Sequence, residues 1–174
     1  MAEPDRHSRF LALLEAHRRI LYKVARVYGG PGVEPDDLVQ ETIAQLWQSF
    51  PRYDDRLRFS TWMYRVALNV AISFQRREGT RKRHLAPESQ EMLEVARDVE
   101  GPPSEDLALL YQCIARLDDL SKALAMLYLD GHDHADIAEV LGISTANVST
   151  RIGRLKDRLR ADMRSLSTDT TKET

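Results

Sequence analysis

Apolar side chains recur every three or four positions along most of the chain, which is the spacing of amphipathic helices. In the first part of the chain this pattern predicts a helix over residues 6–28, ended by the sequence GGPG at 29–32. A second helix is predicted to begin at Pro35, because proline is favoured in the first turn of a helix, and to end at Pro51. The pattern therefore indicates helical structure from the start of the chain.

A third helix is predicted over residues 61–78, after a loop at 51–59 and with Ser60 as its N-cap. One side of this helix is apolar, as expected of a helix that covers a core. Leu68 and Ile72 lie on its other side, among cationic side chains. A helix that is apolar on two sides either packs on both or contacts a partner, and the sequence leaves these alternatives open.

The second half of the chain carries capping residues at the expected helix ends. Ser104 is the predicted N-cap of a fourth helix, and a fifth covers residues 119–129. Asp133 can cap a sixth helix, Gly142 can close it in the left-handed conformation, and Ser144 can cap the last helix. The whole pattern predicts an all-α fold. Two helices joined by such a short turn at the C-terminal end are typical of a helix-turn-helix.

Charged residues are unevenly distributed, although the net charge of the 174 residues is only −2. Residues 60–85 carry six cations and one anion, and residues 144–164 carry six cations and two anions. Between them, residues 86–106 carry seven anions and one cation. Two basic modules around an acidic segment indicate two small helical domains and an acidic linker. The predicted boundaries are 1–79 for the first domain, 80–103 for the linker, 104–166 for the C-terminal helix-turn-helix domain and 167–174 for a disordered tail.

The composition, 43% hydrophobic and 30% charged, is that of an ordinary globular protein. Its single cysteine, Cys113, cannot form an intrachain disulfide bond, and its place on an apolar helix favours a buried apolar role over a redox sensor. The N-terminal sequence MAEPDRHSRF has no apolar segment of the signal-peptide type, and no apolar run reaches the length of a membrane span. We therefore expect a cytoplasmic protein without membrane insertion.

The last predicted helix separates an apolar seam from a polar and cationic face. The seam consists of Val148, Ile152, Leu155 and Leu159. On the other positions, short hydrogen-bonding side chains lie near the N-terminus of the helix and cations follow them. In a helix-turn-helix, the N-terminal residues of the second helix meet base edges in the major groove, while cations meet phosphates. DNA binding is therefore predicted. The alternative is a helical hairpin with a solvated basic face.

Three stretches of the chain resemble the bacterial sigma factors of the extracytoplasmic-function group, which are alternative specificity subunits of RNA polymerase. They are DLVQETIAQLWQSF at 37–50, FSTWMYRVALNVAISFQRR at 59–77 and LDDLSKALAMLYLDGHDHADIAEVLGISTANVSTRIGRLKDRLR at 117–160. They follow one another in the order of that family, on both sides of the acidic segment. The resemblance implies a protein that binds core RNA polymerase, recognises promoter DNA at two elements and opens it. It also implies an anti-sigma factor as a further partner.

The resemblance assigns roles to three groups of residues. The first group would bind the clamp helices of the largest polymerase subunit: Asp37, Leu38, Gln40, Glu41, Gln45 and Trp47. The second would bind and open the minus-ten element: Tyr53, Arg58, Phe59, Ser60, Trp62, Arg65 and Asn69, with Arg76 and Arg77 towards the DNA backbone. The third would bind the minus-thirty-five element: Ser144, Thr145, Asn147, Ser149, Thr150, Arg151, Arg154 and Lys156. The linker would run towards the active-site channel of the polymerase.

The residues of the loop at 51–60 fit the second role on physical grounds as well. Opening a duplex requires an electropositive surface and an aromatic platform that holds an unstacked base. The loop supplies arginines, Tyr53 and Phe59, and Trp62 follows it closely. For Trp62 and for Trp47, a place in the core is favoured over insertion into DNA. For Trp62 the sequence also leaves both roles together open.

The sequence contains no motif that indicates catalysis. It has no glycine-rich phosphate loop, HExxH motif or nucleophile elbow, so neither an enzyme nor a cofactor is predicted. The sequence HDHAD at 132–136 brings His132 and Asp136 onto one helix face, but capping of a helix start is favoured over a metal site. The alternative function is a helix-turn-helix transcriptional regulator that acts without binding the polymerase core. The N-terminal module distinguishes the two, because such a regulator needs no clamp-binding helix.

Overall fold

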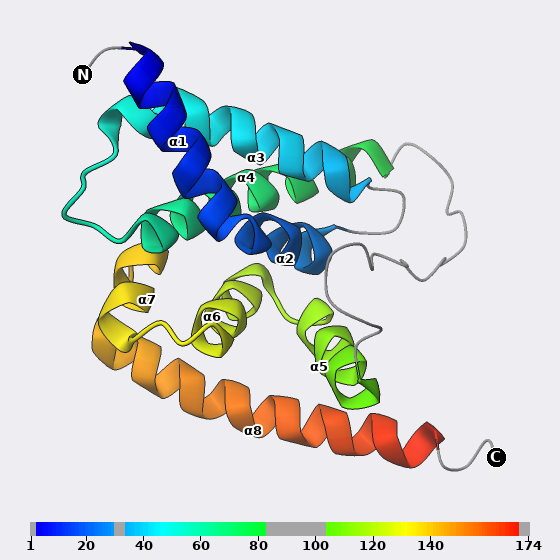
Figure 1. Cartoon of the computed structure of the whole chain (residues 1–174). Coiled ribbons are helices and arrows are strands. Elements are labelled where there is room, and N and C mark those ends of the chain that lie inside the picture. Colours follow the sequence, from blue (N-terminus) through cyan, green and yellow to red (C-terminus); the bar gives the residue numbers. More distant parts are fainter. Residues whose placement is uncertain (1–2, 30–33, 83–103, 171–174) are drawn as a thin grey trace. The chain divides into compact units, whose positions relative to one another are not determined.

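The computed structural model describes residues 3–29, 34–82 and 104–170, and all regular elements in these ranges are helices (Figure 1). The chain divides into two compact units, Met1–Val95 and Ala96–Thr174. The first contains α1 (Glu3–His17), α2 (Arg19–Tyr28), α3 (Pro35–Ser49), the 3-10 helix η1 (Phe50–Arg52) and α4 (Phe59–Lys82). The second contains α5 (Glu105–Ala115), α6 (Asp119–Leu129), α7 (His134–Leu141) and α8 (Thr145–Thr170). The prediction of an all-α fold with two domains is confirmed.

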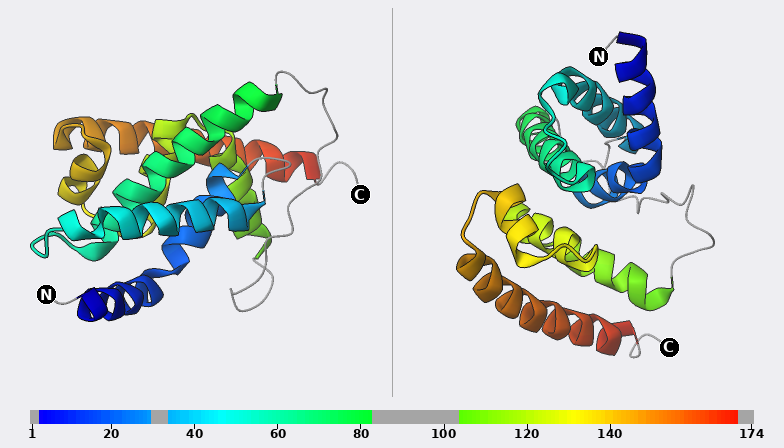
Figure 2. Two further views of the ribbon diagram at one scale, coloured as in Figure 1. Left: turned by 90° about the horizontal axis from the view of Figure 1, so that it is seen from above. Right: turned by 60° about the vertical axis from the view of Figure 1, so that its left-hand side comes forward.

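Three helices of the first unit, α2, α3 and α4, pack against one another around its core (Figures 1 and 2). Pro35 opens α3 as predicted, with acidic residues in the first turn near the positive end of the helix dipole. The largest fully buried side chains of this unit come from all three helices and include Tyr28, Leu38, Leu46, Met63 and Tyr64. This core fixes α3 and α4 relative to each other, and these two helices carry most of the predicted site residues of the first unit.

The helix predicted over 6–28 is in fact two helices, which meet at Arg18. Around this residue the backbone N–H groups of Arg18 and Leu21 donate to carbonyl oxygens three residues earlier, at 3.4 and 3.0 Å. Hydrogen bonds of this spacing tighten the helix locally and change its direction. As a result α1 diverges from α2 and packs Phe10 against Trp47 of α3, with ring centroids 5.1 Å apart. The sequence has neither glycine nor proline at this point, so apolar spacing alone predicted one continuous helix.

Ser60 was predicted to be the N-cap of α4. Instead α4 begins at Phe59, and Ser60 lies inside its first turn. The backbone N–H of Trp62 donates to the carbonyl oxygen of Arg58 at 3.1 Å, which places Arg58 at the N-cap. The helix starts earlier because Phe59 is buried together with Trp62, and this contact fixes the first turn. At its other end α4 continues to Lys82, into the predicted linker, and the rest of the linker lies outside the described residues.

In the second unit, α5, α6 and α7 lie along one side of α8 (Figures 1 and 2). The apolar seam predicted for α8 faces these helices: Val148, Ile152 and Leu155 are buried, and Leu159 is half-buried. Cys113 of α5 is buried as predicted, and this burial raises the pKa of its thiol. Because the seam faces inward, the remaining sides of α8 face the solvent.

Side-chain caps fix the starts of all four helices in the second unit. Each cap accepts a backbone N–H from three residues later: Ser104 from Leu107 at 3.3 Å, Asp118 from Ser121 at 3.0 Å, Asp133 from Asp136 at 2.8 Å and Ser144 from Asn147 at 3.2 Å. Gly142 has a φ of 66°, the left-handed conformation that glycine adopts readily and that closes a helix. The predicted caps at Ser104, Asp133 and Ser144 and the predicted turn at Gly142 are confirmed, and α7 and α8 form the helix-turn-helix.

The last helix is longer than expected. The helix α8 ends at Thr170, whereas disorder was predicted from residue 167, and residues 171–174 lie outside the described part of the chain. Neither α8 nor any other described helix combines the length and the apolar character that a membrane span needs.

Candidate nucleic-acid interface

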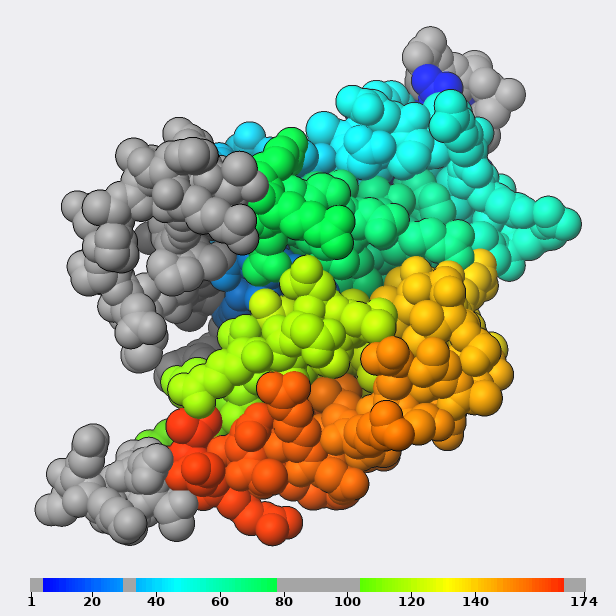
Figure 3. All heavy atoms as spheres, turned by 180° about the vertical axis from the view of Figure 1, so that it is seen from behind, coloured from blue at the N-terminus to red at the C-terminus, as the bar shows by residue number. Residues whose placement is uncertain are grey.

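The helix α8, drawn in orange to red, lies at the surface of the second unit (Figure 3), and its polar side is open to the solvent. Seven of the eight residues predicted to bind the minus-thirty-five element are exposed: Ser144, Thr145, Asn147, Ser149, Thr150, Arg151 and Arg154. Lys156 differs, because it is half-buried and its Nζ lies 4.6 Å from the centroid of the Tyr128 ring of α6. A cation over an aromatic face is held there by the charge distribution of the ring. Lys156 therefore helps to pack α8 on α6 and contributes less to the exposed face.

Three arginines, Arg151, Arg154 and Arg158, lie along one side of the exposed face. Together with Ser121 in the first turn of α6, they border a pocket of about 160 Å³. Arg151 is held in place, since its Nε donates to Oδ1 of Asn147 at 2.8 Å. Leu117, Leu124 and Leu155 complete the lining of the pocket. Guanidinium groups attract anions, so the arginine side of the pocket suits a phosphate group. Arg158 was not among the predicted site residues, although its helical spacing from Arg151 and Arg154 puts it on the same side.

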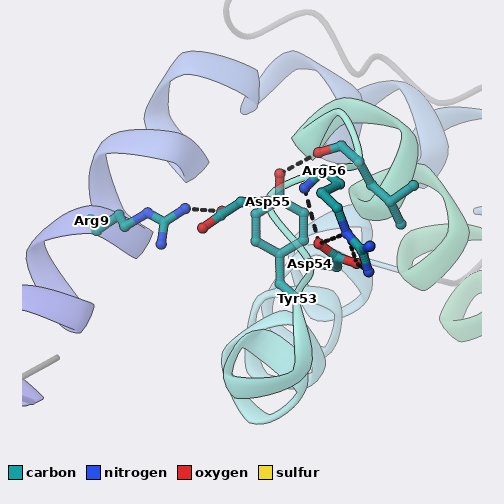
Figure 4. A network of polar contacts seen from close by, with 6 residues as sticks. Arg9, Tyr53, Asp54, Asp55 and Arg56 are labelled. Carbon is teal, nitrogen blue, oxygen red and sulfur yellow. Dashed lines mark hydrogen bonds and ion pairs between the residues drawn. The ribbon is translucent and has the colours of Figure 1, made fainter.

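The loop between η1 and α4 is held by a network of polar contacts (Figure 4). The Tyr53 hydroxyl donates to a carbonyl oxygen four residues later, at 2.7 Å. Arg56 donates to the Asp54 carboxylate from its backbone N–H at 3.0 Å, from Nε at 2.9 and 3.1 Å and from Nη2 at 2.6 Å. Arg9 of α1 forms an ion pair with Asp55 (Figure 4). The side chains of the loop thus support its conformation, and one of them ties it to α1.

The hydrogen bonds from Arg56 lower the pKa of the Asp54 carboxyl from 3.8 to about 2. A carboxyl group with a lowered pKa in the folded chain contributes to stability above its unfolded pKa, and the contribution is lost as the pH falls through the folded value. We expect an NMR titration of the full chain to give Asp54 a midpoint of about 2, and Arg56→Gln to move it back towards 3.8. A midpoint that R56Q leaves unchanged would contradict this assignment.

An aromatic cluster lies beside the loop and contains three residues predicted to contact the minus-ten element. The ring centroids of Tyr53, Phe59 and Trp62 lie 5.0 to 5.5 Å apart, and Phe50 stacks on Tyr53 at 5.9 Å. Phe59 and Trp62 are only 5% and 9% exposed. The structure therefore places both in the core, which the sequence favoured for Trp62, and corrects the assignment of Phe59 and Trp62 to the DNA-contacting surface. Tyr53 is half-buried and keeps part of its ring in contact with solvent.

The remaining residues of the predicted minus-ten surface lie along α4 and just before it. Four of them are exposed, namely Arg58, Asn69, Arg76 and Arg77, whereas Ser60 and Arg65 are half-buried. The Nη2 group of Arg77 donates to Oε1 of Glu41 in α3 at 2.5 Å. This ion pair connects an arginine predicted to meet the DNA backbone with a residue predicted to meet the polymerase.

The residues predicted to bind the polymerase lie on the surface of α3, with one exception. Asp37, Gln40 and Gln45 are exposed, and Glu41 and Trp47 are half-buried. Leu38 is 1% exposed and belongs to the core between α2, α3 and α4. The prediction that Leu38 contacts the polymerase is therefore wrong: its place on the buried side of an amphipathic helix assigns it to packing.

A groove of about 450 Å³ lies between α1 and α3. Its lining is mostly apolar and consists of His7, Phe10, Leu11, Leu14, Gln40, Ile43, Ala44 and Trp47. Leu11 remains 47% exposed at its edge. Because Gln40 and Trp47 line it, the groove continues the surface predicted to bind the polymerase. Exposed apolar surfaces of this kind mark sites for other proteins. The residues from α1 were missed, since no local pattern shows that α1 lies beside α3.

No three histidine, cysteine or acidic side chains within the described ranges come together as metal ligands would. In the sequence HDHAD, the Nδ1 atom of His132 lies 3.8 Å from Oδ2 of Asp136, and Asp133 is the N-cap of α7. The acidic residues of this motif thus stabilise the start of a helix, which is the interpretation that the sequence favoured.

Comparison with known proteins connects both units to one family. The model of sigma-70 region 2 matches residues 13–81, and the model of sigma-70 region 4 matches residues 107–159. The RNA polymerase sigma factor NccH of Alcaligenes xylosoxydans xylosoxydans is 31% identical over 94% of this chain and 91% of that protein. The ECF RNA polymerase sigma-E factor of Haemophilus influenzae is 30% identical over 70% of each chain. The chain belongs to the extracytoplasmic-function sigma factors.

A solved structure shares the fold of this sigma factor. It is the complex of the sigma factor RpoE with the anti-sigma factor NepR from Bartonella quintana, with a TM-score of 0.72 over 92% of this chain and 97% of that chain, at 19% identity. The two family matches and the curated relatives confirm the resemblance noted in the sequence. Sigma factors are not a family of enzymes. The first match includes the loop and α4 up to residue 81, and the second includes α7 and the part of α8 up to residue 159. Part of the groove, including Leu11, precedes residue 13.

Proposed function

We propose that this sigma factor binds core RNA polymerase through its first unit and recognises one promoter element with each unit. The exposed polar face of α8, presented by a capped helix-turn-helix, is the observation that carries the proposal. The predicted domain boundaries, 1–79 and 104–166, are proposed as the limits of these two functional parts. Between them, the acidic linker would follow the polymerase towards its active-site channel.

In the second unit, α8 enters the major groove at the minus-thirty-five element. The short polar residues from Ser144 to Thr150 lie at the N-terminal end of the helix, where a recognition helix meets base edges. The arginines that border the pocket beside α6 face a phosphate group of the same site. The polar part of the face supports the contact with base edges, and the cationic part supports the contact with a phosphate group.

Replacing Arg154 by alanine should weaken binding of the holoenzyme to this element by about tenfold and lower the slope of log affinity against log salt by about one, as the loss of one phosphate contact does. Arg151→Ala should act in the same direction. Fluorescence anisotropy with a labelled promoter duplex at several salt concentrations measures both quantities. Arg164→Ala, an exposed cation farther along α8, is the matched control. Wild-type affinity and slope in both variants would exclude this side of α8 from the DNA interface.

In the first unit, the loop at 53–58 and the exposed side of α4 bind the minus-ten element and hold it open. The aromatic cluster supports the loop from within, so Phe59 and Trp62 act by positioning it. Tyr53 offers a partly exposed ring to an unstacked base, and base–aromatic contacts of this type offset the cost of unstacking. The exposed arginines Arg58 and Arg76 supply positive charge next to it.

The exposed side of α3 and the groove beside it bind the clamp helices of the polymerase. Asp37, Gln40, Glu41 and Gln45 form the polar part of this surface, and Trp47 leads into the apolar groove. A polar rim beside an apolar centre is the usual composition of a protein interface. Leu11 and its neighbours in α1 are therefore part of the same binding surface.

We further propose that an anti-sigma factor controls this chain. The support is the fold shared with RpoE of Bartonella quintana, whose solved structure contains the anti-sigma factor NepR. A subunit that works on the polymerase and on chromosomal DNA acts in the cytoplasm, which is the compartment expected from the sequence.

Reconstitution with purified core RNA polymerase tests the proposed function. We expect the chain to form a stable complex with the core enzyme and to direct transcripts from specific promoters. A chain that binds DNA but neither joins the core enzyme nor directs a transcript would instead be the helix-turn-helix regulator that the sequence left as the alternative.

A further inference from the structure

Gly153 lies inside α8, where a glycine is unfavourable for the free protein. It is exposed, and a Cβ atom added to it would meet no atom within 4 Å. Its φ is not in the left-handed region, because among the described glycines only Gly131 and Gly142 have a positive φ. Glycine loses more conformational freedom in a helix than alanine does. Neither the packing nor the backbone of the folded chain therefore requires a glycine at this position.

The position of Gly153 on α8 indicates a role for the space that its missing side chain leaves open. Helical spacing puts it on the same exposed surface as Ser149 and Thr150, four and three residues before it, and next to Arg154. These neighbours belong to the face that we assign to the minus-thirty-five element. Gly153 thus leaves a gap of one side chain among residues that meet DNA.

We propose that Gly153 is a point of direct contact with a base pair of the minus-thirty-five element, where the missing side chain lets the base edge reach the helix backbone. The inference rests on the proposed function of α8 and adds a specificity-determining position to it. A methyl group at this position occupies the space that the base edge needs. Alanine at position 153 should therefore raise the stability of the free protein and lower the affinity of the holoenzyme for DNA.

The variants Gly153→Ala and Gly153→Leu test this inference in the full-length chain. Thermal unfolding of the free protein should show a melting temperature about 3–6 °C higher for G153A, because the helix is stabilised. Holoenzyme binding to duplexes randomised over the upstream element should show a loss of at least about fivefold for G153A, the lower end of the cost of one mismatched base pair. The loss should be concentrated at one or two base pairs and should be larger for G153L.

Two further variants separate the possible causes of a negative result. Ala161→Gly, an exposed alanine on the same helix, should lower the melting temperature and leave DNA selection unchanged. If Arg154→Ala loses affinity while G153A binds and selects DNA like the wild type, the contact at Gly153 is refuted and the role of α8 stands. A loss for G153A that is equal on all sequences also refutes a base contact. If R154A and G153A both behave like the wild type, the proposed role of α8 fails as well.

Discussion

A Phe59→Ala variant should lose about 3–5 kcal/mol of the free energy of unfolding of the first unit, the usual cost of removing a large aromatic side chain from a core. Phe59 is 5% exposed, and its ring centroid lies 5.3 Å from that of Trp62 and 5.5 Å from that of Tyr53. Truncation leaves a cavity in the cluster that supports the promoter-binding loop. Both tryptophans of the chain, Trp47 and Trp62, belong to the first unit, so urea unfolding followed by tryptophan fluorescence reports on it directly.

Two comparisons separate this core role from direct contact with DNA. Phe59→Leu should lose much less stability than F59A, because it keeps most of the buried volume. Arg58→Ala should leave stability within about 0.5 kcal/mol of the wild type, as exposed positions do, and should reduce permanganate reactivity of the melted promoter. If F59A instead unfolds like the wild type and loses only promoter opening, Phe59 contacts DNA and its assignment to the core is wrong.

The features that the sequence predicted correctly are those decided by neighbouring residues. The caps at Ser104, Asp133 and Ser144 each bond to a backbone group three residues away, and the left-handed turn at Gly142 follows from the residue itself. The buried seam of α8 likewise follows from helical spacing. Local rules of this kind are sufficient to locate the helix-turn-helix and the exposed face of its second helix.

The features that the sequence missed depend on contacts between distant residues. Phe59 and Leu38 were assigned to binding surfaces because they stand in stretches that resemble a family's functional motifs. Resemblance does not tell which side of a helix is buried, and packing puts both side chains in the core. The break at Arg18 was missed for a related reason. It turns α1 towards Trp47, and the groove between α1 and α3 exists only because of that turn.

The groove leads to the second large effect, the loss of polymerase binding in a Leu11→Asp variant. Leu11 lines the groove and is 47% exposed in the free chain, so a charged side chain at this position can remain hydrated and should leave the fold intact. In a complex that fills the groove, the same carboxylate is buried without a partner, which is strongly unfavourable. We expect affinity for core RNA polymerase to fall at least about 30-fold, the effect of losing a binding hot spot.

Tyr22→Asp provides the matched control for this prediction. Tyr22 is an exposed apolar residue of the same unit, on α2 and outside the groove, so its replacement should change affinity for the core enzyme less than about twofold. Affinities from fluorescence anisotropy of labelled chains and melting temperatures from circular dichroism should be measured for both variants. Wild-type affinity in L11D would limit the polymerase surface to α3. A loss in both variants with lowered melting temperatures would mean that the substitutions disturb the fold. Only a selective loss in L11D, at an unchanged melting temperature, makes α1 part of the surface that joins this sigma factor to the polymerase.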